Sequence, residues 1–280
     1  MWEETGLTAP RRTLVSTWLP GVEVVSDHSW GLTDTQVLRL RHDGADYTAK
    51  CFGPRNHHFE RELRGHREFT APLLPDARVP RLVRADEDTR VLLLTWLPGR
   101  LVEGDPSATE PDTHRQAGEL LARFHDQPGR PSTTWLDEVR DRTLRWLAHP
   151  HRIPSRVVER VRAHGWPAGP VDLVPTHGDV SPRNWVVHDG VVSLIDLGRA
   201  DLRPAASDLG RLQHRSWRGR PDLEAAFLEG YGADPRRTRW WPSVVLAELV
   251  ATAAWAHQVG DEAFEAEGLR GLAEIFPADA

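Results

Sequence analysis

The stretch Thr176-His-Gly-Asp-Val-Ser-Pro-Arg-Asn-Trp-Val-Val187, followed by Val192-Ser-Leu-Ile-Asp196, decides the fold of this chain. It places the carboxylate of Asp179 five residues before the carboxamide of Asn184, on a loop that contains a proline. Two apolar runs follow, separated by an Asp-Gly pair, and the second run ends in the carboxylate of Asp196. Asp-Gly between apolar runs predicts a β-hairpin, which would return Asp196 to the side of Asn184.

These three side chains form the set that phosphoryl transfer from a nucleotide requires. One Asp accepts the proton of the attacking hydroxyl, whereas an Asn and another Asp hold the magnesium ions that bridge the phosphates. The spacing of Asp179 and Asn184 matches that of a kinase catalytic loop. Taken singly, Asp179 fits an Asx turn and the other two fit structural roles equally well. Together, at this spacing, they favour catalysis.

The motif HGDxxxxN, followed by IDxxxA, resembles the aminoglycoside phosphotransferase family and its relatives, the choline, homoserine and fructosamine kinases. Gly178 precedes the predicted base here, where protein kinases usually carry Arg. The helical string Ala117-Gly-Glu-Leu-Leu-Ala-Arg-Phe-His125 is similar to another motif of that family. By the same resemblance, Asp208 matches the next aspartate of the family and supports the loop, and His177 braces it from within.

The resemblance implies an α+β, bilobal protein kinase-like fold. An antiparallel-sheet N-terminal lobe that binds nucleotide would cover residues 1–94, and a mainly helical C-terminal lobe that carries catalysis and substrate binding would cover residues 95–280. Residues 95–99 would form the hinge. Helical spacing of apolar residues is expected over residues 114–125, 135–149, 153–164 and 244–259.

The composition of the 280 residues excludes several classes of protein. The hydrophobic and charged fractions, 39% and 27%, are those of an ordinary soluble protein. There is no apolar run long enough to span a membrane and no signal-peptide pattern. The single cysteine, Cys51, excludes an internal disulfide framework, so we expect a cytoplasmic location. A net charge of -6 argues against a nucleic-acid partner.

Lys50 is the only lysine in the chain. It ends the third of three alternating segments, at residues 22–25, 37–40 and 47–50, which predict an antiparallel meander. In an ATP-binding lobe, a lysine at the end of the third strand reaches the α and β phosphates.

The turn between the first two of these segments contains Ser29, Gly31 and Thr33. In an ATP-binding lobe this turn would lie over the phosphates. It has one glycine and no Walker pattern, so an ordinary hairpin turn is the alternative.

A helical segment is expected over residues 59–69. Kinases need a glutamate here to hold the phosphate-binding lysine by an ion pair. Glu62 fits the pattern of the family best, and we interpret Glu60 and Glu68 as solvated.

Residues 91–97 form a near-continuous apolar run that suits a buried strand and is broken by Pro98 and Gly99. The run resembles the interlobe hinge of the family. By that resemblance Leu94 would be the gatekeeper, and the backbone of Thr95 and Leu97 would bond the adenine edge.

The tail is rich in acids over residues 260–267. In the antibiotic kinases that this chain resembles, acids of the C-terminal lobe and its last helices receive the ammonium groups of the substrate. The candidates here are Glu248, Asp261, Glu262 and Glu265. A solvated helix face is the alternative for each.

The leading hypothesis is an ATP-dependent O-phosphotransferase that modifies a hydroxyl of a cationic antibiotic and so gives resistance. The acceptor would be an aminoglycoside or a tuberactinomycin-type peptide such as capreomycin or viomycin. Asp179 would be the catalytic base, Asn184 and Asp196 would bind Mg²⁺, and Lys50, held by Glu62, would position the phosphates of ATP or, alternatively, GTP.

Two alternatives stay open. The first is a small-metabolite kinase of the choline, homoserine or fructosamine type. The second is a nucleotide-binding pseudokinase, which is disfavoured because degenerate kinases usually lose at least one of the four residues Lys50, Asp179, Asn184 and Asp196. We expect a monomer or a homodimer that binds a small molecule, with no nucleic-acid or membrane partner.

Overall fold

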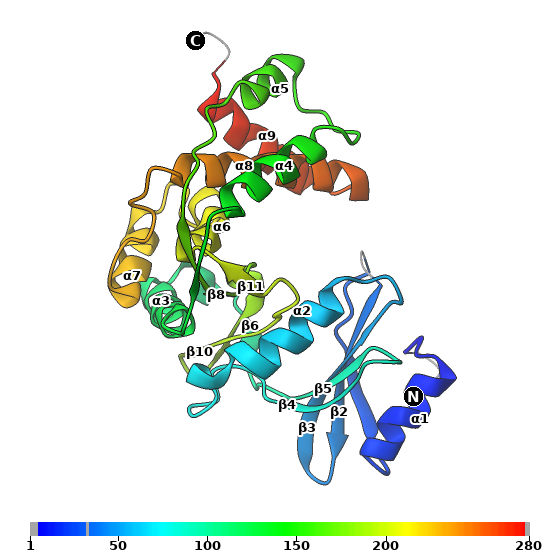
Figure 1. The fold of residues 1–280 in the computed structure, drawn as a ribbon. Coiled ribbons are helices and arrows are strands. Elements are labelled where there is room, and N and C mark those ends of the chain that lie inside the picture. Colours follow the sequence, from blue (N-terminus) through cyan, green and yellow to red (C-terminus); the bar gives the residue numbers. More distant parts are fainter. Residues whose placement is uncertain (1–4, 32–33, 278–280) are drawn as a thin grey trace.

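The computed structural model describes residues 5–31 and 34–277, which form an α+β fold of the protein kinase type (Figure 1). An antiparallel sheet lies at the N-terminal end, and a mainly helical region lies beyond it. Helix α2 runs between the two parts in the view of Figure 1. The predicted fold class is confirmed. The lobe boundary at residues 94 and 95 stays a prediction.

The N-terminal sheet has five antiparallel strands in the order β1-β2-β3-β5-β4. Its strands are β1 (Glu23–Asp27), β2 (Thr35–His42), β3 (Ala45–Phe52), β4 (Leu82–Asp86) and β5 (Val91–Thr95). The predicted meander corresponds to the first three strands, and the predicted buried strand corresponds to β5.

Strand β5 is apolar throughout because both of its faces are covered. Val91 and Leu93 pack in one cluster with Val15 of helix α1 (Ala9–Trp18). Leu92 and Leu94 point to the other face, in a cluster with residues of helix α2 (His58–Arg64), which continues into a π-helical turn at Gly65–Phe69. Alternate side chains of a strand point to opposite faces, so a strand between two helices needs apolar residues at every position.

Up to residue 277, the last that the structure describes, the C-terminal region combines seven helices and two small sheets. The helices are α3 (Pro111–His125), α4 (Trp135–Trp146), α5 (Ser155–Arg162), α6 (Gly210–His214), α7 (Pro221–Tyr231), α8 (Trp241–Val259) and α9 (Glu262–Ile275). One sheet has the order β10-β9-β6, from Val191–Leu194, Trp185–His188 and Arg100–Leu101; the other has the order β11-β8-β7, from Asp201–Arg203, Val171–Thr176 and Arg130–Ser132. Short helical turns lie at Ala71–Leu73, Pro106–Thr109, Pro182–Asn184 and Ala205–Leu209.

Helices α3 and α7 cross in close contact because each has a glycine at the crossing. A Cβ on Gly118 would lie 2.1 Å from the carbonyl oxygen of Phe227, and a Cβ on Gly230 would lie 1.9 Å from that of Arg115. Either distance is shorter than any van der Waals contact. The contact therefore requires glycine on both helices, and it supports the core behind the catalytic loop, where Trp185 is fully buried.

Helix α8 is apolar on most of its circumference and lies against α4, α6 and α9 (Figure 1). A helix that is apolar all round belongs in the interior of a protein or in a membrane. Within the described ranges, no helix meets the length and hydropathy that a bilayer crossing requires. The contacts of α8 with α4, α6 and α9 account for its apolar composition.

The placement of Cys51 inside the N-terminal sheet can be tested by the reactivity of its thiol. Its side chain is fully buried in β3, and burial raises the pKa of the thiol to about 11. Because the thiolate is the reactive form, we expect the folded protein at pH 8 to react with a disulfide reagent at least about 100-fold more slowly than the unfolded protein. Absorbance of the released thiolate, with and without denaturant, measures both rates. Rapid labelling of the folded protein would contradict this placement.

Candidate active site

The hairpin places Asp196 beside Asn184, as predicted. Val191 pairs with His188 and Leu194 pairs with Trp185, and the backbone N–H of Ile195 donates to the carbonyl of Asn184 at 3.0 Å. The turn at Asp189 and Gly190 has positive φ at both residues, 47° and 78°, which is the conformation that two-residue hairpins favour. Asp196 itself has a φ of 65°, so its backbone turns sharply as the strand ends.

The carboxylate of Asp208 holds the loop before Asp179. Its oxygens accept from the backbone N–H of His177 at 2.8 Å and from that of Gly178 at 2.6 Å. His125 lies 3.1 Å from the same carboxylate. Burial raises the pKa of Asp208, but the hydrogen bond from His125 and the nearby positive charges lower it more, so that the pKa lies below its usual value. The anion therefore remains ionised in the interior and supports the loop, as the resemblance implied.

Gly178 has a conformation and a position that exclude other residues. Its φ is +79°, and an added Cβ would lie 2.1 Å from the carbonyl oxygen of Arg199. This explains why the Arg of protein kinases has no equivalent here. His177 donates through Nε2 to the carbonyl of Ile195 at 3.0 Å, so it links the loop to the end of the hairpin.

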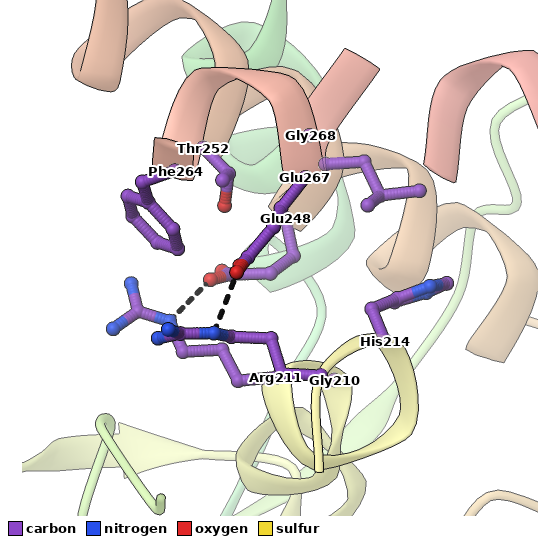
Figure 2. Close-up of a pocket in the computed structure, with 10 residues that line it drawn as sticks. Gly210, Arg211, His214, Glu248, Thr252, Phe264, Glu267 and Gly268 are labelled. Atoms are coloured by element: carbon purple, nitrogen blue, oxygen red, sulfur yellow. Dashed lines mark hydrogen bonds and ion pairs between the residues drawn. The ribbon is translucent and has the colours of Figure 1, made fainter. Parts of the chain in front are cut away.

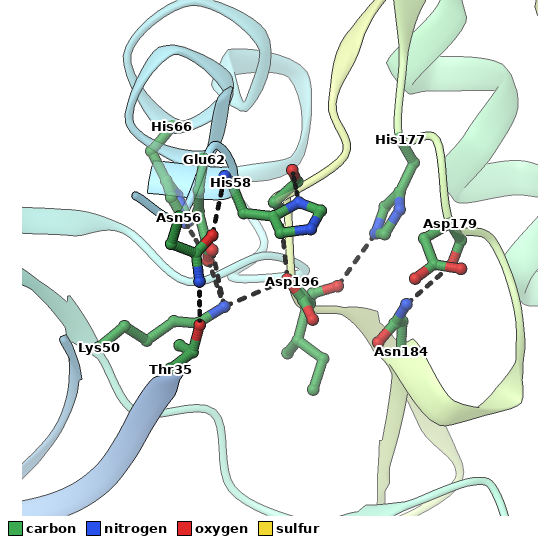
Figure 3. Close-up of polar contacts among 12 residues, drawn as sticks. Thr35, Lys50, Asn56, His58, Glu62, His66, His177, Asp179, Asn184 and Asp196 are labelled. Atoms are coloured by element: carbon green, nitrogen blue, oxygen red, sulfur yellow. Dashed lines mark hydrogen bonds and ion pairs between the residues drawn. The ribbon is translucent and has the colours of Figure 1, made fainter. Parts of the chain in front are cut away.

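Lys50, Glu62 and Asp196 meet at one point (Figure 3). The Lys50 ammonium donates to both oxygens of Glu62, at 2.6 and 2.7 Å, and to Oδ1 of Asp196 at 3.2 Å. Burial alone would lower the pKa of Lys50, but the charges of Asp196 and Glu62 raise it. The ammonium therefore stays protonated, and it joins β3, α2 and the hairpin.

Asp179 has both carboxylate oxygens engaged by arginines. Oδ2 accepts from Nη2 of Arg183 at 2.6 Å, and Oδ1 accepts from Nη1 of Arg211. Burial raises the pKa of this carboxyl, but the charges of Arg211 and Arg183 bring it far below its usual range. The side-chain amide of Asn184 donates to the backbone carbonyl of Asp179 at 2.8 Å (Figure 3).

The two arginines were not predicted. Arg183 lies inside the motif, four residues after Asp179 in the short turn Pro182–Asn184, so its proximity could have been suspected. Arg211 belongs to α6, 32 residues from Asp179, and nothing in its local sequence indicates the contact.

The predicted phosphate-binding turn is partly described. Ser29 accepts through its hydroxyl from the backbone N–H of Val37 at 3.0 Å. A Cβ on Gly31 would have no neighbour within 4 Å, and Thr33 lies outside the described residues. Trp30 of the same turn lies under the guanidinium of Arg183, 5.9 Å from the ring centre, so the turn reaches the catalytic loop.

The predicted hinge lies where β5 ends. Leu94 is buried against α2, and the backbone N–H of Thr95 donates to the carbonyl of Arg81 at 2.9 Å. Trp96 donates to the carbonyl of Asp46 at 3.2 Å. Within the described part of the chain, the backbone N–H of Leu97 forms no hydrogen bond. That group is available to a ligand.

The four predicted substrate acids lie in different places. Glu248 of α8 accepts from Nε of Arg211 at 2.6 Å, so it is one side chain away from Asp179. Asp261 caps α9, where it accepts from the backbone N–H of Phe264 at 3.0 Å. Glu265 is buried beside His257 at 3.1 Å, and Glu262 is exposed. Of the four, Glu248 alone is linked to Asp179 by the contacts of the described residues.

A pocket between α6, α8 and α9 adjoins the catalytic loop through Arg211 (Figure 2). Two ion pairs lie in it, Arg211 with Glu248 at 2.6 Å and Arg215 with Glu267 at 2.8 Å. Both guanidiniums lie near the ring of Phe264, at 5.8 and 5.1 Å. The other lining residues are Gly210, His214, Leu249, Thr252 and Gly268.

Comparisons with known proteins found a matching family and similar solved structures. The model of the phosphotransferase enzyme family matches residues 24–241. Macrolide 2'-phosphotransferase MphH from Brachybacterium faecium is 18% identical, with a TM-score of 0.63 over 98% of this chain and 100% of that chain. A thermostable mutant of aminoglycoside phosphotransferase APH(4)-Ia, in ternary complex with ADP and hygromycin B, is 14% identical, with a TM-score of 0.69 over 96% and 98%.

A choline/ethanolamine kinase family protein from Mesorhizobium loti is 17% identical, with a TM-score of 0.64 over 95% of this chain and 91% of that chain. At these identities the similar structures establish the fold alone. No curated protein sequence matches the chain.

The network around Asp208 can be tested by Asp208→Asn. The amide cannot accept from two backbone N–H groups and from His125 at once, and its NH₂ group would face a donor. We expect the substitution to lower the free energy of unfolding by about 3 kcal/mol and the melting temperature by roughly 6–12 °C. Thermal denaturation followed by circular dichroism measures this. Asp222→Asn, at an exposed pair with Arg220, is the control and should change little; an unaltered Asp208→Asn protein would refute the bracing role.

Proposed function

Since the chain belongs to the phosphotransferase enzyme family, and is a phosphotransferase that acts on hydroxyl groups, we propose that it transfers the γ-phosphoryl group of ATP to a cationic antibiotic. An aminoglycoside or a tuberactinomycin-type peptide such as capreomycin or viomycin is the proposed acceptor. Phosphorylation would add a charge of about -1.5 to -2 to a ligand whose target is anionic RNA, and so give resistance.

One observation carries the proposal. Lys50, Glu62 and Asp196 form one hydrogen-bonded group, and Asp179 and Asn184 form another at the base of the same hairpin. This is the arrangement that phosphoryl transfer uses to hold the phosphates on one side and the acceptor hydroxyl on the other. The carboxylate of Glu248, in the adjoining pocket, supports a cationic acceptor.

The nucleotide would be held by the N-terminal sheet and the hinge. Lys50 would contact the α and β phosphates while Glu62 keeps its ammonium in place. Ser29, Gly31 and Thr33 would cover the phosphates. Leu94 would limit the adenine pocket, and the backbone of Thr95 and Leu97 would bond the adenine edge. The free N–H of Leu97 supports this placement.

ATP is the proposed nucleotide, with GTP as the alternative. The similar APH(4)-Ia structure contains ADP, and another similar structure is a GDP complex of aminoglycoside 2'-phosphotransferase-IIIa. Both are complexes of other proteins at 14% and 15% identity, so the choice of base is left to experiment.

The donor atoms suit a magnesium ion. Asn184 donates its NH₂ group to Asp179, which leaves its carbonyl oxygen as a ligand, and Asp196 uses Oδ1 for Lys50, which leaves Oδ2. Among the described residues, no three His, Cys, Asp or Glu side chains gather as a self-sufficient metal site. This fits Mg²⁺, which in such sites takes one or two protein oxygens and completes its coordination with phosphates and water. When bound, Mg²⁺ would neutralise phosphate charge.

Asp179 would act on the acceptor hydroxyl. Its carboxylate would orient the hydroxyl and accept the proton as the acceptor oxygen bonds to the γ-phosphorus. The bond from that phosphorus to the bridging oxygen breaks at the same time, and ADP leaves with the electron pair.

A small-metabolite kinase is the second candidate function. It is favoured by the structural similarity to the choline/ethanolamine kinase family protein. Its chemistry is the same, and its acceptor would be a hydroxyl of choline, homoserine or fructosamine.

Turnover with a panel of acceptors tests both functions. We expect ADP release, measured by a coupled assay, with one cationic antibiotic and not with choline, homoserine or fructosamine. Because general base catalysis contributes about 10²–10⁴-fold, Asp179→Asn should lower kcat by a factor in that range. Asp222→Asn serves as the control. Activity on a metabolite alone would replace the antibiotic by that metabolite, and full activity of Asp179→Asn would refute the assignment of the base.

A further inference from the structure

The side chain of Arg211 bridges the catalytic loop and the pocket. Its Nη1 donates to Oδ1 of Asp179, and its Nε donates to Oε1 of Glu248. Figure 2 shows Arg211 beneath Glu248, with Phe264 to one side. One guanidinium therefore spans the proposed base and a carboxylate of the pocket.

The contact of Arg211 with Asp179 would keep an acceptor hydroxyl from the proposed base. A general base must lie within hydrogen-bond reach of the proton that it removes. Oδ2 of Asp179 is taken by Arg183 and Oδ1 by Arg211, so an acceptor hydroxyl has to displace one of the two arginines or compete with it. Arg211 lines the pocket, whereas Arg183 lies on the catalytic loop itself. Arg211 is therefore the one that an acceptor entering from the pocket would meet.

The two hydrogen bonds of Arg211 indicate what kind of ligand could replace its guanidinium. Nε and Nη1 are bonded to the same carbon atom and donate to two different carboxylates, and the group that carries them is cationic. A hydroxyl and an ammonium group on neighbouring carbon atoms, in the gauche conformation, present two donors at a comparable separation. The hydroxyl would take the place of Nη1 on Asp179, and the ammonium would take the place of Nε on Glu248.

We propose that Arg211 occupies the acceptor position while no acceptor is bound, and that the acceptor is a vicinal amino alcohol which displaces it. The proposal rests on the proposed function, because it takes Asp179 to be the base. It adds that the hydroxyl to be phosphorylated lies next to a cationic nitrogen. An alcohol without that nitrogen would displace Arg211 and leave Glu248 without a cation, which costs free energy.

The same contact would protect ATP. Water at Oδ1 of Asp179 would be activated like an acceptor hydroxyl, with its proton passing to Asp179 and its oxygen bonding to the γ-phosphorus as ADP leaves. While Arg211 holds Oδ1, that position is closed to water. Without acceptor the enzyme should therefore hydrolyse bound ATP slowly, and an acceptor that displaces Arg211 should open the site.

The test removes Arg211 and measures ATP hydrolysis without acceptor. We expect Arg211→Ala to raise the rate of ADP release at least about five-fold, and Asp179→Asn in the same protein to abolish the increase. Millimolar methylguanidinium should enter the gap and suppress the hydrolysis again, whereas methylurea, which is neutral and of similar shape, should not. Arg211→Gln, which keeps most of the side-chain volume, repeats the measurement in case Arg211→Ala is unstable.

Arg236→Ala is the matched control. The side chains of Arg236 and Arg211 are both 11% exposed. Arg236 also contacts two carboxylates, Glu224 at 2.6 Å and Asp234 at 2.8 Å, and lies over an aromatic ring, that of Trp217 at 5.6 Å. It does not line the pocket. We expect its loss to leave hydrolysis at the wild-type rate.

Small alcohols test the acceptor class. In the Arg211→Ala protein, 2-aminoethanol should be phosphorylated at least about ten-fold faster than ethane-1,2-diol or 5-aminopentan-1-ol, and Glu248→Gln should remove this preference. Equal rates for the three alcohols would refute the amino-alcohol rule. Unchanged or slower hydrolysis in both Arg211 variants, with methylguanidinium inert, would refute displacement. Failure of the proposed function looks different, because wild type would then transfer phosphate to none of the antibiotics or metabolites of the panel.

Discussion

The structure depends on the burial of one ammonium group between two carboxylates. Lys50 is 8% exposed, and it contacts Glu62 of α2 and Asp196 at the end of the hairpin. Removing a charge from water is costly unless partners and hydrogen bonds compensate for it. The sheet, α2 and the hairpin must therefore come together for the only lysine of the chain to be satisfied. Phosphate binding would use the same charge, so the stability of the site and its chemistry have one origin.

A second carboxylate organises the other side of the site. The carboxylate of Asp208 accepts hydrogen bonds from the backbone N–H groups of His177 and Gly178. It thereby fixes the backbone immediately before Asp179. The two halves meet at the hairpin, where His177 bonds the carbonyl of Ile195 and Asp196 follows. The site is thus built from backbone groups held by buried acids, and the proposed base Asp179 and metal ligand Asn184 are themselves buried, at 5% and 4% exposure.

Much of this architecture could be predicted because it depends on short-range patterns. Asp189-Gly190 specifies a tight hairpin turn through positive φ, and the uninterrupted apolar run of β5 specifies a strand covered on both faces. The pairing of Lys50 with Glu62 followed from the resemblance to a known family. The predicted helix ends were off by a few residues, as at α4, which ends at Trp146 where the pattern ran to His149, because the last turn is set by packing.

By itself, the sequence determined the fold class, the reaction type and the positions proposed for the base, the metal ligands and the phosphate-binding lysine. The base and the metal ligands belong to a motif of fixed local spacing, the resemblance carried by that motif implies the fold, and Lys50 is the only lysine and ends the predicted meander. Only the tertiary structure decided that Arg211 contacts both Asp179 and Glu248, and that Asp261 caps helix α9. Contacts between helices far apart in the chain depend on how whole elements pack. An isolated charged residue on a helix carries no local signal of the partner that it will meet.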